Sequence, residues 1–409
     1  MNFKNQFIIY ITFLILSVYN YSFDYFRPTE TVILFVLLIL LVNFNKISKL
    51  AIYGTLFITY LLMVLLLTVD GSLIFYGIHN LQIWVYAIVF LALSKLFADL
   101  DLEEHKTVIL KAVWISLAFL ILIFTLNSFG FAPTLALVGE TLEDFDKTAI
   151  RVPGFSYVVI FFIAVLFYLF KAKKMLYFWF IAGVLVLFYF DATRSTIIAF
   201  FLVMMVLHLS YKIIVPLILI LMLSYSMLFT FAAQLGNSDN EHAVRVAETI
   251  YFYKSVSVYR RYLDIQQTIK QVSDINVWTG ASTGLKLNLW RSSINFDYKI
   301  GQILIKDATG KRYYNYHCPD NSFLLMYVDG GLILLFFILA VMIKSFITIW
   351  RYDPRLAWTF LIIIIIIGFL SKHVISNYVY VFTLGFIYFY AKLDNKKRKE
   401  DEIESLANQ

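Results

Sequence analysis

The residues of this chain that could do chemistry lie at the edges of apolar segments, and Arg194 is the first of them. It lies in Asp191-Ala-Thr-Arg-Ser-Thr, at the first turn of a predicted helix. A cation near a helix N-terminus opposes the helix dipole, so helix stability does not explain this arginine. The free N–H groups of that turn and a guanidinium together favour an anion site. The alternative is an ion pair with Asp191 in a tight turn.

Three further arginines are candidates for the same anion site. Arg151 lies in Arg-Val-Pro-Gly, where Pro153 is suited to begin a helix; the alternative is an arginine that reaches the headgroups. Arg260 and Arg261 lie in a predicted amphipathic helix whose apolar positions recur at helical spacing: Val258, Tyr262, Ile265, Ile269 and Val272. Arg261 borders this apolar face and Arg260 points almost opposite. If the face packs on the membrane domain, Arg261 is directed toward a buried site; the alternative is a helix lying on lipid headgroups.

The segment after this helix ends with a histidine and an acid just before another apolar run. His317 and Asp320 immediately precede a predicted helix that begins at Asn321. Asp320 or Ser322 is expected to cap that helix. A single histidine is more often structural than catalytic, so His317 is a candidate base with a structural alternative.

Asp329 is an acid inside the same apolar run. It lies eight residues after Asn321, which is about 12 Å deeper by helical rise. An acid at that depth is costly and indicates a site or a partner. The alternative is a satisfied carboxylate beside Gly330-Gly331, a position suited to close packing.

Metal and cofactor sites are poorly supported. Asp99-Leu-Asp101, followed by Glu103, Glu104 and His105, resembles a metal-sugar motif, but the predicted topology puts it in the cytoplasm. An acidic cluster around Glu143 lies on the outer side without an accompanying histidine. We therefore predict no metal and no cofactor.

Composition determines the kind of element that must position these residues. The chain has 409 residues, of which 61% are hydrophobic and 15% are charged, and its mean hydropathy is +0.78. Soluble domains carry about 25% charged residues, and a globule of this composition would expose large apolar patches. This excludes a soluble enzyme, a disordered chain and a nucleic-acid binder. The single cysteine, Cys318, excludes a disulfide framework.

The apolar runs predict an all-α integral membrane protein with about 12 transmembrane helices, since each span needs about 20 mostly apolar residues. The predicted spans are Gln6–Tyr21, Glu30–Asn43, Leu50–Val69, Leu81–Phe97, Thr107–Phe129, Phe155–Phe170, Met175–Asp191, Ser195–His208, Ile213–Ala233, Asn321–Met342, Ala357–Ser371 and Ile375–Ala391.

The basic residues orient these spans. Lysines and arginines concentrate in alternate short loops and in the C-terminal tail, among them Lys46, Lys49, Lys171, Lys173, Lys174, Arg351 and Lys396. Such loops face the cytoplasm, so both termini are predicted inside. The chain then divides into spans one to nine (1–233), a long periplasmic loop (234–320), spans ten to twelve (321–391) and a cytoplasmic tail (392–409).

Together these features resemble the O-antigen ligase and O-antigen polymerase superfamily. The resemblance rests on a long outer loop between late spans and on three motifs: Arg-Val-Pro-Gly at Arg151, Thr-Arg-Ser at Arg194, and the run from Arg260-Arg261 through His317 to Asn321-Ser-Phe-Leu and Asp329-Gly-Gly. The family commonly has histidine directly before the asparagine. Here Asp320 takes that place and His317 lies four residues before the asparagine, so either could be the base.

The resemblance implies a metal-independent, inverting glycosyltransferase of the bacterial inner membrane. The arginines would bind the pyrophosphate, His317 or Asp320 would be catalytic, and Asn321 and Asp329 would support them. Donor and acceptor would be oligosaccharides linked to polyprenyl pyrophosphate, and a chain-length regulator is a further partner that the resemblance allows. A polymerase is favoured; the alternatives are a ligase that transfers glycan to lipid A-core and a polysaccharide flippase.

Overall fold

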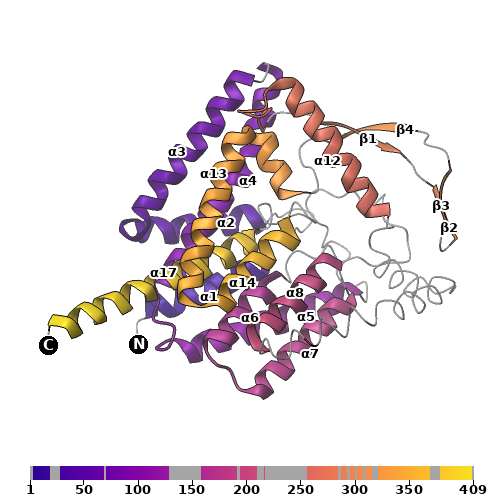
Figure 1. Ribbon diagram of the computed structural model, residues 1–409. Helices are drawn as coiled ribbons and strands as arrows, with labels where there is room; N and C mark the ends of the chain where they lie inside the picture. The colour runs from indigo at the N-terminus through magenta and orange to yellow at the C-terminus, as the bar shows by residue number, and fades with distance from the viewer. Residues whose placement is uncertain are drawn as a thin grey trace.

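The computed structural model describes residues 3–18, 28–68, 71–128, 158–190, 194–209, 216, 256–283, 287–292, 295–299, 302–306, 310–315, 321–368 and 378–407. Most of them are helical (Figure 1). The helices of the first half are α1 (Phe3–Val18), α2 (Pro28–Val42), α3 (Phe44–Thr68), α4 (Gly71–Ala98), α5 (Lys106–Ser128), α6 (Val159–Leu169), α7 (Lys174–Phe190) and α8 (Arg194–His208). Those of the second half are α12 (Val256–Ile275), α13 (Ser322–Tyr352), α14 (Pro354–Ile362), the π-helical η4 (Ile363–Ile367) and α17 (Tyr378–Ala407).

The predicted spans overlap these helices, with one exception. Ile213–Ala233 lies outside the described residues apart from Pro216. Among the described residues, three segments are long and apolar enough to cross a membrane: α3, the part Asn80–Ala98 of α4, and α13. Several other apolar helices are shorter, with 10 to 17 described residues, so the number of spans stays a prediction.

The outer surface of the helices is apolar, as a lipid-facing surface must be. On α3, Leu56 is 62% exposed and Leu67 is 82% exposed, and on α13 Phe336 and Phe337 are more than half exposed. Apolar surface of this extent would aggregate in water. The chain is therefore a predominantly helical membrane protein.

Aromatic side chains fill the centre of the helical bundle. Every residue from Val159 to Phe167 of α6 is fully buried, which is expected of a helix that is apolar on all sides and lies inside a bundle. The Phe162 ring packs edge-on or tilted against Phe13 of α1, Phe97 of α4 and Phe382 of α17, with centroids 5.0 to 5.6 Å away. These contacts join the beginning, middle and end of the chain in one core.

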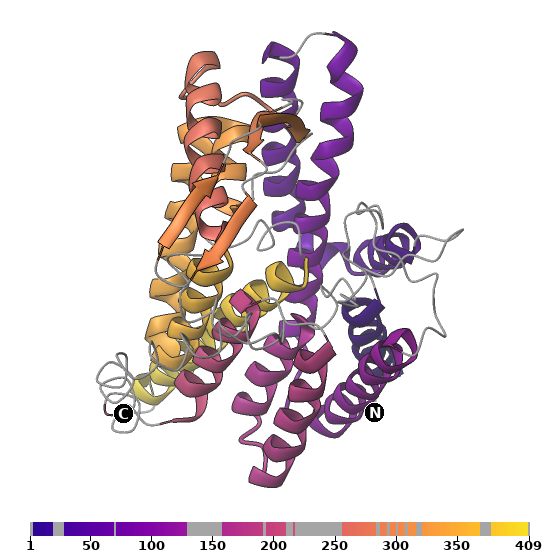
Figure 2. The same ribbon diagram turned by 90° about the vertical axis from the view of Figure 1, so that its right-hand side faces the viewer.

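The elements that hold the candidate site and those that form the aromatic core lie in different parts of the molecule. α12 and the adjoining ends of α3 and α4 lie in the upper part of Figures 1 and 2. α1 and the end of α17 lie in the lower half of both views. α13 runs between the two regions, so it links the core to α12.

The predicted long loop, 234–320, contains regular structure that the sequence analysis did not predict. Besides α12 it holds two antiparallel strand pairs. β1 (Leu287–Ser292) pairs with β4 (Gly310–Asn315), and Leu287 lies opposite Asn315. β2 (Asn295–Lys299) pairs with β3 (Gln302–Lys306), and Asn295 lies opposite Lys306. The fold is thus mainly but not wholly α-helical.

Candidate functional site

The structure describes only some of the predicted site residues fully. Arg151, His317 and Asp320 lie outside the described residues. Arg194 is the first residue of α8, and Arg260 and Arg261 lie in α12, but the side chains of these three arginines are not described. Asn321 and Asp329, the two predicted supporting residues, are described in full.

Asn321 is the cap of α13. It has extended backbone angles, and its side-chain oxygen accepts from the N–H groups of Phe323 at 2.9 Å and Leu324 at 3.0 Å. Capping by Asp320 or Ser322 was the expectation, and it was wrong, because Asn321 makes both bonds and Ser322 is already inside the helix. Asn321 is 6% exposed, so the start of α13 is fixed within the protein.

α12 packs on the N-terminal half of α13 through one face. Ile265 and Val272 contact the cluster formed by Leu324, Tyr327 and Val328 of α13 and by Ala281. Thr268, between them on the same face, is fully buried. Of the two alternatives for this helix, packing on the membrane domain therefore holds for Ile265 and Val272.

The phase of this face differs from the predicted one. Ile269 was expected to face inward, yet it is 45% exposed. The inward positions 265, 268 and 272 follow helical spacing, and position 261 continues the same row one turn earlier. The backbone register thus puts Arg261 at the centre of the packed side of α12, and Arg260 about 100° away.

α13 is broken in its first third. Gly330 and Gly331 have non-helical angles, and Gly331 has a φ of 64° and a ψ of −159°. A break inside a membrane leaves backbone groups that need partners. The turn that follows α12, residues 276–283, supplies them: Ala281 N donates to Val328 O at 2.8 Å, and Leu332 N donates to Val277 O at 3.0 Å.

The two backbones approach closely because both carry glycine at the crossing. A Cβ atom on Gly331 would lie 2.2 Å from the carbonyl oxygen of Trp278, and one on Gly280 would lie 2.5 Å from Gly331 N. Both glycines also have a positive φ. Residues 276–283 are therefore a turn that docks on α13.

We therefore expect Gly331→Ala to destabilise the protein by about 2 kcal/mol or more, since it combines backbone strain with a clash against backbone atoms. Thermal unfolding of the detergent-solubilised protein measures this. Gly183→Ala is the matched control, because the added methyl group would meet its nearest atom at 3.6 Å. An equal, small effect of both substitutions would contradict the close crossing.

Polar side chains from α3 and α4 hold the broken region in place. Tyr60 donates to Gly330 O at 3.0 Å, and Trp84 Nε1 donates to Asp329 Oδ2 at 2.7 Å. Asn80 Nδ2 donates to Thr283 O at 2.7 Å. The turn 276–283 is thus clamped between α4 and α13.

Trp84, Tyr60 and Asn80 were not among the predicted site residues. The sequence of α4 does contain a pattern that points to this contact. Gly77, Asn80 and Trp84 follow the spacing of one helix face inside an apolar segment. Thr283 Oγ1 donates to Gly77 O at 2.9 Å, which confirms that this face meets the turn.

Asp329 is only partly satisfied. Its side chain is 1% exposed, and its Oδ1 has no hydrogen-bond partner among the described residues. The alternative of a satisfied carboxylate is thus met at Oδ2 by Trp84, and no partner for Oδ1 lies among the described residues.

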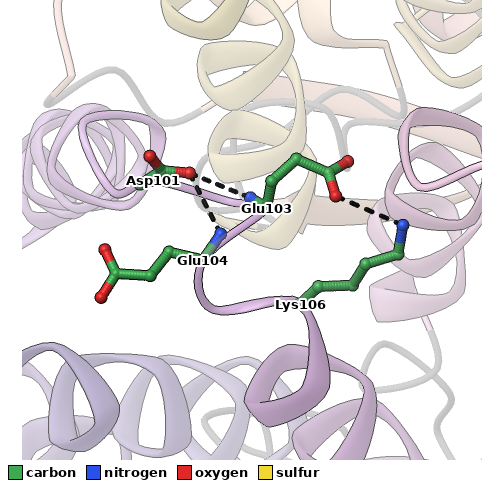
Figure 3. A network of polar contacts seen from close by, with 4 residues as sticks. All are labelled: Asp101, Glu103, Glu104 and Lys106. Carbon is green, nitrogen blue, oxygen red and sulfur yellow. Dashed lines mark hydrogen bonds and ion pairs between the residues drawn. The ribbon is translucent and has the colours of Figure 1, made fainter. Parts of the chain in front are cut away.

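The Asp-x-Asp motif at the other end of α4 has a structural role. Asp101 Oδ1 accepts from the N–H groups of Glu103 and Glu104, both at 3.1 Å, and Lys106 Nζ lies 3.4 Å from Glu103 Oε2 (Figure 3). Asp101 thus closes a turn. Among the described residues, no group of three or more His, Cys, Asp or Glu side chains is arranged to hold a metal ion.

Asp99, the first acid of this motif, lies near two lysines. Burial raises the pKa of Asp99, and the positive charges of Lys95 and Lys46 lower it to a smaller extent. Lys95 Nζ also donates to the carbonyl of Lys46. The turn therefore ties the end of α4 to the start of α3.

These elements define a predominantly helical membrane protein in which an amphipathic helix and its following turn dock on a broken, apolar helix. A scan of protein-family models and a search of curated proteins found no match to the chain.

Proposed function

We propose that this chain is a membrane glycosyltransferase that polymerises lipid-linked oligosaccharide repeat units at the outer face of the bacterial cytoplasmic membrane. The donor and the acceptor are glycans carried on polyprenyl pyrophosphate. The proposal rests on the order of motifs in the sequence and on one structural observation, the packing of α12 against α13.

That packing supports the proposal because α12, which carries Arg260 and Arg261, packs on α13, which begins directly after the predicted base. Position 261 belongs to the row of α12 that packs on α13. Asn321 caps α13, and His317 and Asp320 come immediately before it in the sequence. We therefore propose that an arginine of α12 and a base that precedes α13 in the sequence serve one reaction centre.

The chemistry follows from the residue types. The anomeric C–O bond to pyrophosphate breaks, and the acceptor hydroxyl oxygen attacks the same carbon from the opposite side with inversion. The base, His317 or Asp320, takes the hydroxyl proton. Guanidinium groups of Arg194 and Arg261, with Arg151 and Arg260 as further candidates, stabilise the charge that develops on the leaving pyrophosphate.

Two other functions have support. A ligase would use the same donor and transfer the glycan to lipid A-core, and nothing in the site distinguishes it from a polymerase. A polysaccharide transporter is favoured by the break in α13 with its buried acid, since broken helices with ionisable groups are common at transport sites. The docking of α12 and of the turn 276–283 on α13 favours the enzyme.

Deleting the gene and analysing the cell's polysaccharide separates these three functions. A polymerase predicts single repeat units on the final acceptor. A ligase predicts full-length polymer that stays on the lipid carrier, and a transporter predicts repeat units that accumulate at the inner face. Unchanged polysaccharide would contradict all three.

The proposal also requires the long segment 234–320 to lie outside and the end of α17 inside. In a Cys318→Ser background, an impermeant thiol reagent should label Ser238→Cys in intact cells and should label Ser405→Cys only after lysis. Ser405 is exposed, so its cysteine is accessible once the membrane is open. Labelling of Ser405→Cys in intact cells would reverse the orientation.

A further inference from the structure

Among the described residues, the carboxylate of Asp329 has no positively charged partner. Trp84 donates one neutral hydrogen bond to Oδ2, and no described residue bonds to Oδ1. The Tyr60 hydroxyl is directed to the Gly330 carbonyl instead. A carboxylate that is 1% exposed and holds one neutral donor is a costly group in an apolar surrounding.

The elements packed around Asp329 bring few other titratable or charged groups. α3 contributes Tyr60, and α13 itself contributes Tyr327, whose hydroxyl lies 3.4 Å from Ser273 Oγ. On α12, Lys270 and Asp274 are exposed, and the side chains of Arg260, Arg261 and Asp264 are not described. α4 contributes His79, whose side chain is not described, and the turn 276–283 has no charged residue. Among the described residues, no ion pair of Asp329 compensates its charge.

The backbone around Asp329 also favours positive charge. Asp329 is the last residue before the break in α13, so it lies at the C-terminal end of a half-helix. That end carries partial negative charge and carbonyl oxygens that no longer bond within the helix. Half-helix ends of this kind, together with an acid, hold small cations in membrane transporters.

We propose that Asp329 Oδ1 binds an exchangeable monovalent cation, a sodium ion or a proton, at the break of α13. The burial of Asp329 limits the ligand to a small ion, because a sugar or an organic ammonium ion cannot reach a side chain that is 1% exposed. The bound charge neutralises Asp329 and stabilises the docking of the turn 276–283 between α4 and α13. This site does not depend on the proposed glycosyl transfer.

Thermal unfolding of the purified full-length protein in detergent tests the site without any enzyme assay. Sodium chloride replaces choline chloride at constant ionic strength and pH, and in a second series the pH changes at constant sodium. For a sodium site, sodium raises the Tm by about 2 °C or more. For a proton site, lower pH raises the Tm and sodium has no effect.

Asp329→Asn is the decisive variant, because it keeps an oxygen for Trp84 and removes the charge. In Asp329→Asn the Tm should no longer depend on sodium or on pH as it does in the wild type. The matched variant Asp274→Asn, at an exposed position, should keep the wild-type dependence. Two results would overturn the proposal: a Tm that depends on sodium or pH equally in Asp329→Asn and in the wild type, or a wild-type Tm that depends on neither. In both cases the partner of Oδ1 would be a water molecule.

Trp84→Phe keeps the proposal testable if Asp329→Asn does not fold. It removes the neutral donor, so the carboxylate holds its cation more tightly. The sodium or proton concentration at which half of the rise in Tm is reached should fall by about fivefold. A change of this size corresponds to the loss of one hydrogen bond to the carboxylate. An unchanged midpoint would contradict the site.

Discussion

Replacing His317 by alanine is expected to lower the rate of polymer formation by about 100- to 10,000-fold, the usual contribution of a positioned base. A histidine in water has a pKa of about 6.5, so a neutral imidazole is available at the outer face to accept the hydroxyl proton. The measurement is the initial rate with a lipid-linked repeat unit, at a protein level matched to the wild type. Donor binding should be unchanged.

Asp320→Asn is the comparison that assigns the base. Because Asn321 caps α13 through both of its bonds, a change at Asp320 does not remove the helix cap. Loss of activity in this variant therefore cannot be attributed to a lost cap. An active His317→Ala together with an inactive, folded Asp320→Asn would move the role of the base to Asp320.

The second large effect concerns the arginines. Arg194→Lys and Arg261→Lys should each lower the rate of polymer formation by about 100-fold or more. Lysine keeps the positive charge but lacks the planar pair of N–H donors with which a guanidinium binds a pyrophosphate. Initial rates at saturating donor measure this. The loss should appear in kcat as well as in KM, since the charge develops as the bond breaks.

Arg260→Lys is the matched control for Arg261→Lys. Both residues lie in α12, but the inward row at 265, 268 and 272 continues to position 261 and not to 260. Arg260→Lys should therefore have the milder effect. If Arg260 is the sensitive residue and Arg261 is not, the register of α12 does not direct Arg261 to the site.

The helices could be predicted from the sequence because burial in lipid or in a bundle requires continuous apolar runs. Their ends were harder to predict. α4 begins at Gly71 rather than at Leu81, and the additional turns carry Gly77 and Asn80. These positions are stabilised by Thr283, about 200 residues later in the chain, which local hydropathy cannot reveal.

The site could be predicted only in part, for a similar reason. Asp329 stood out as an acid at depth, but its partner Trp84 is 245 residues away in sequence. Gly330-Gly331 was noted as a packing position, yet the break of α13 depends on backbone bonds from the turn 276–283. The strands β1 to β4 were not predicted at all, because hydropathy marked their segments only as polar loop.

Reconstitution of the purified chain in liposomes tests the central proposal most directly. The liposomes contain a polyprenyl-pyrophosphate-linked repeat unit, and the buffer contains a chelator. The account predicts a ladder of glycans that grow by whole repeat units, with release of one polyprenyl pyrophosphate for each bond formed. Folded protein that forms no polymer and releases no polyprenyl pyrophosphate would contradict it.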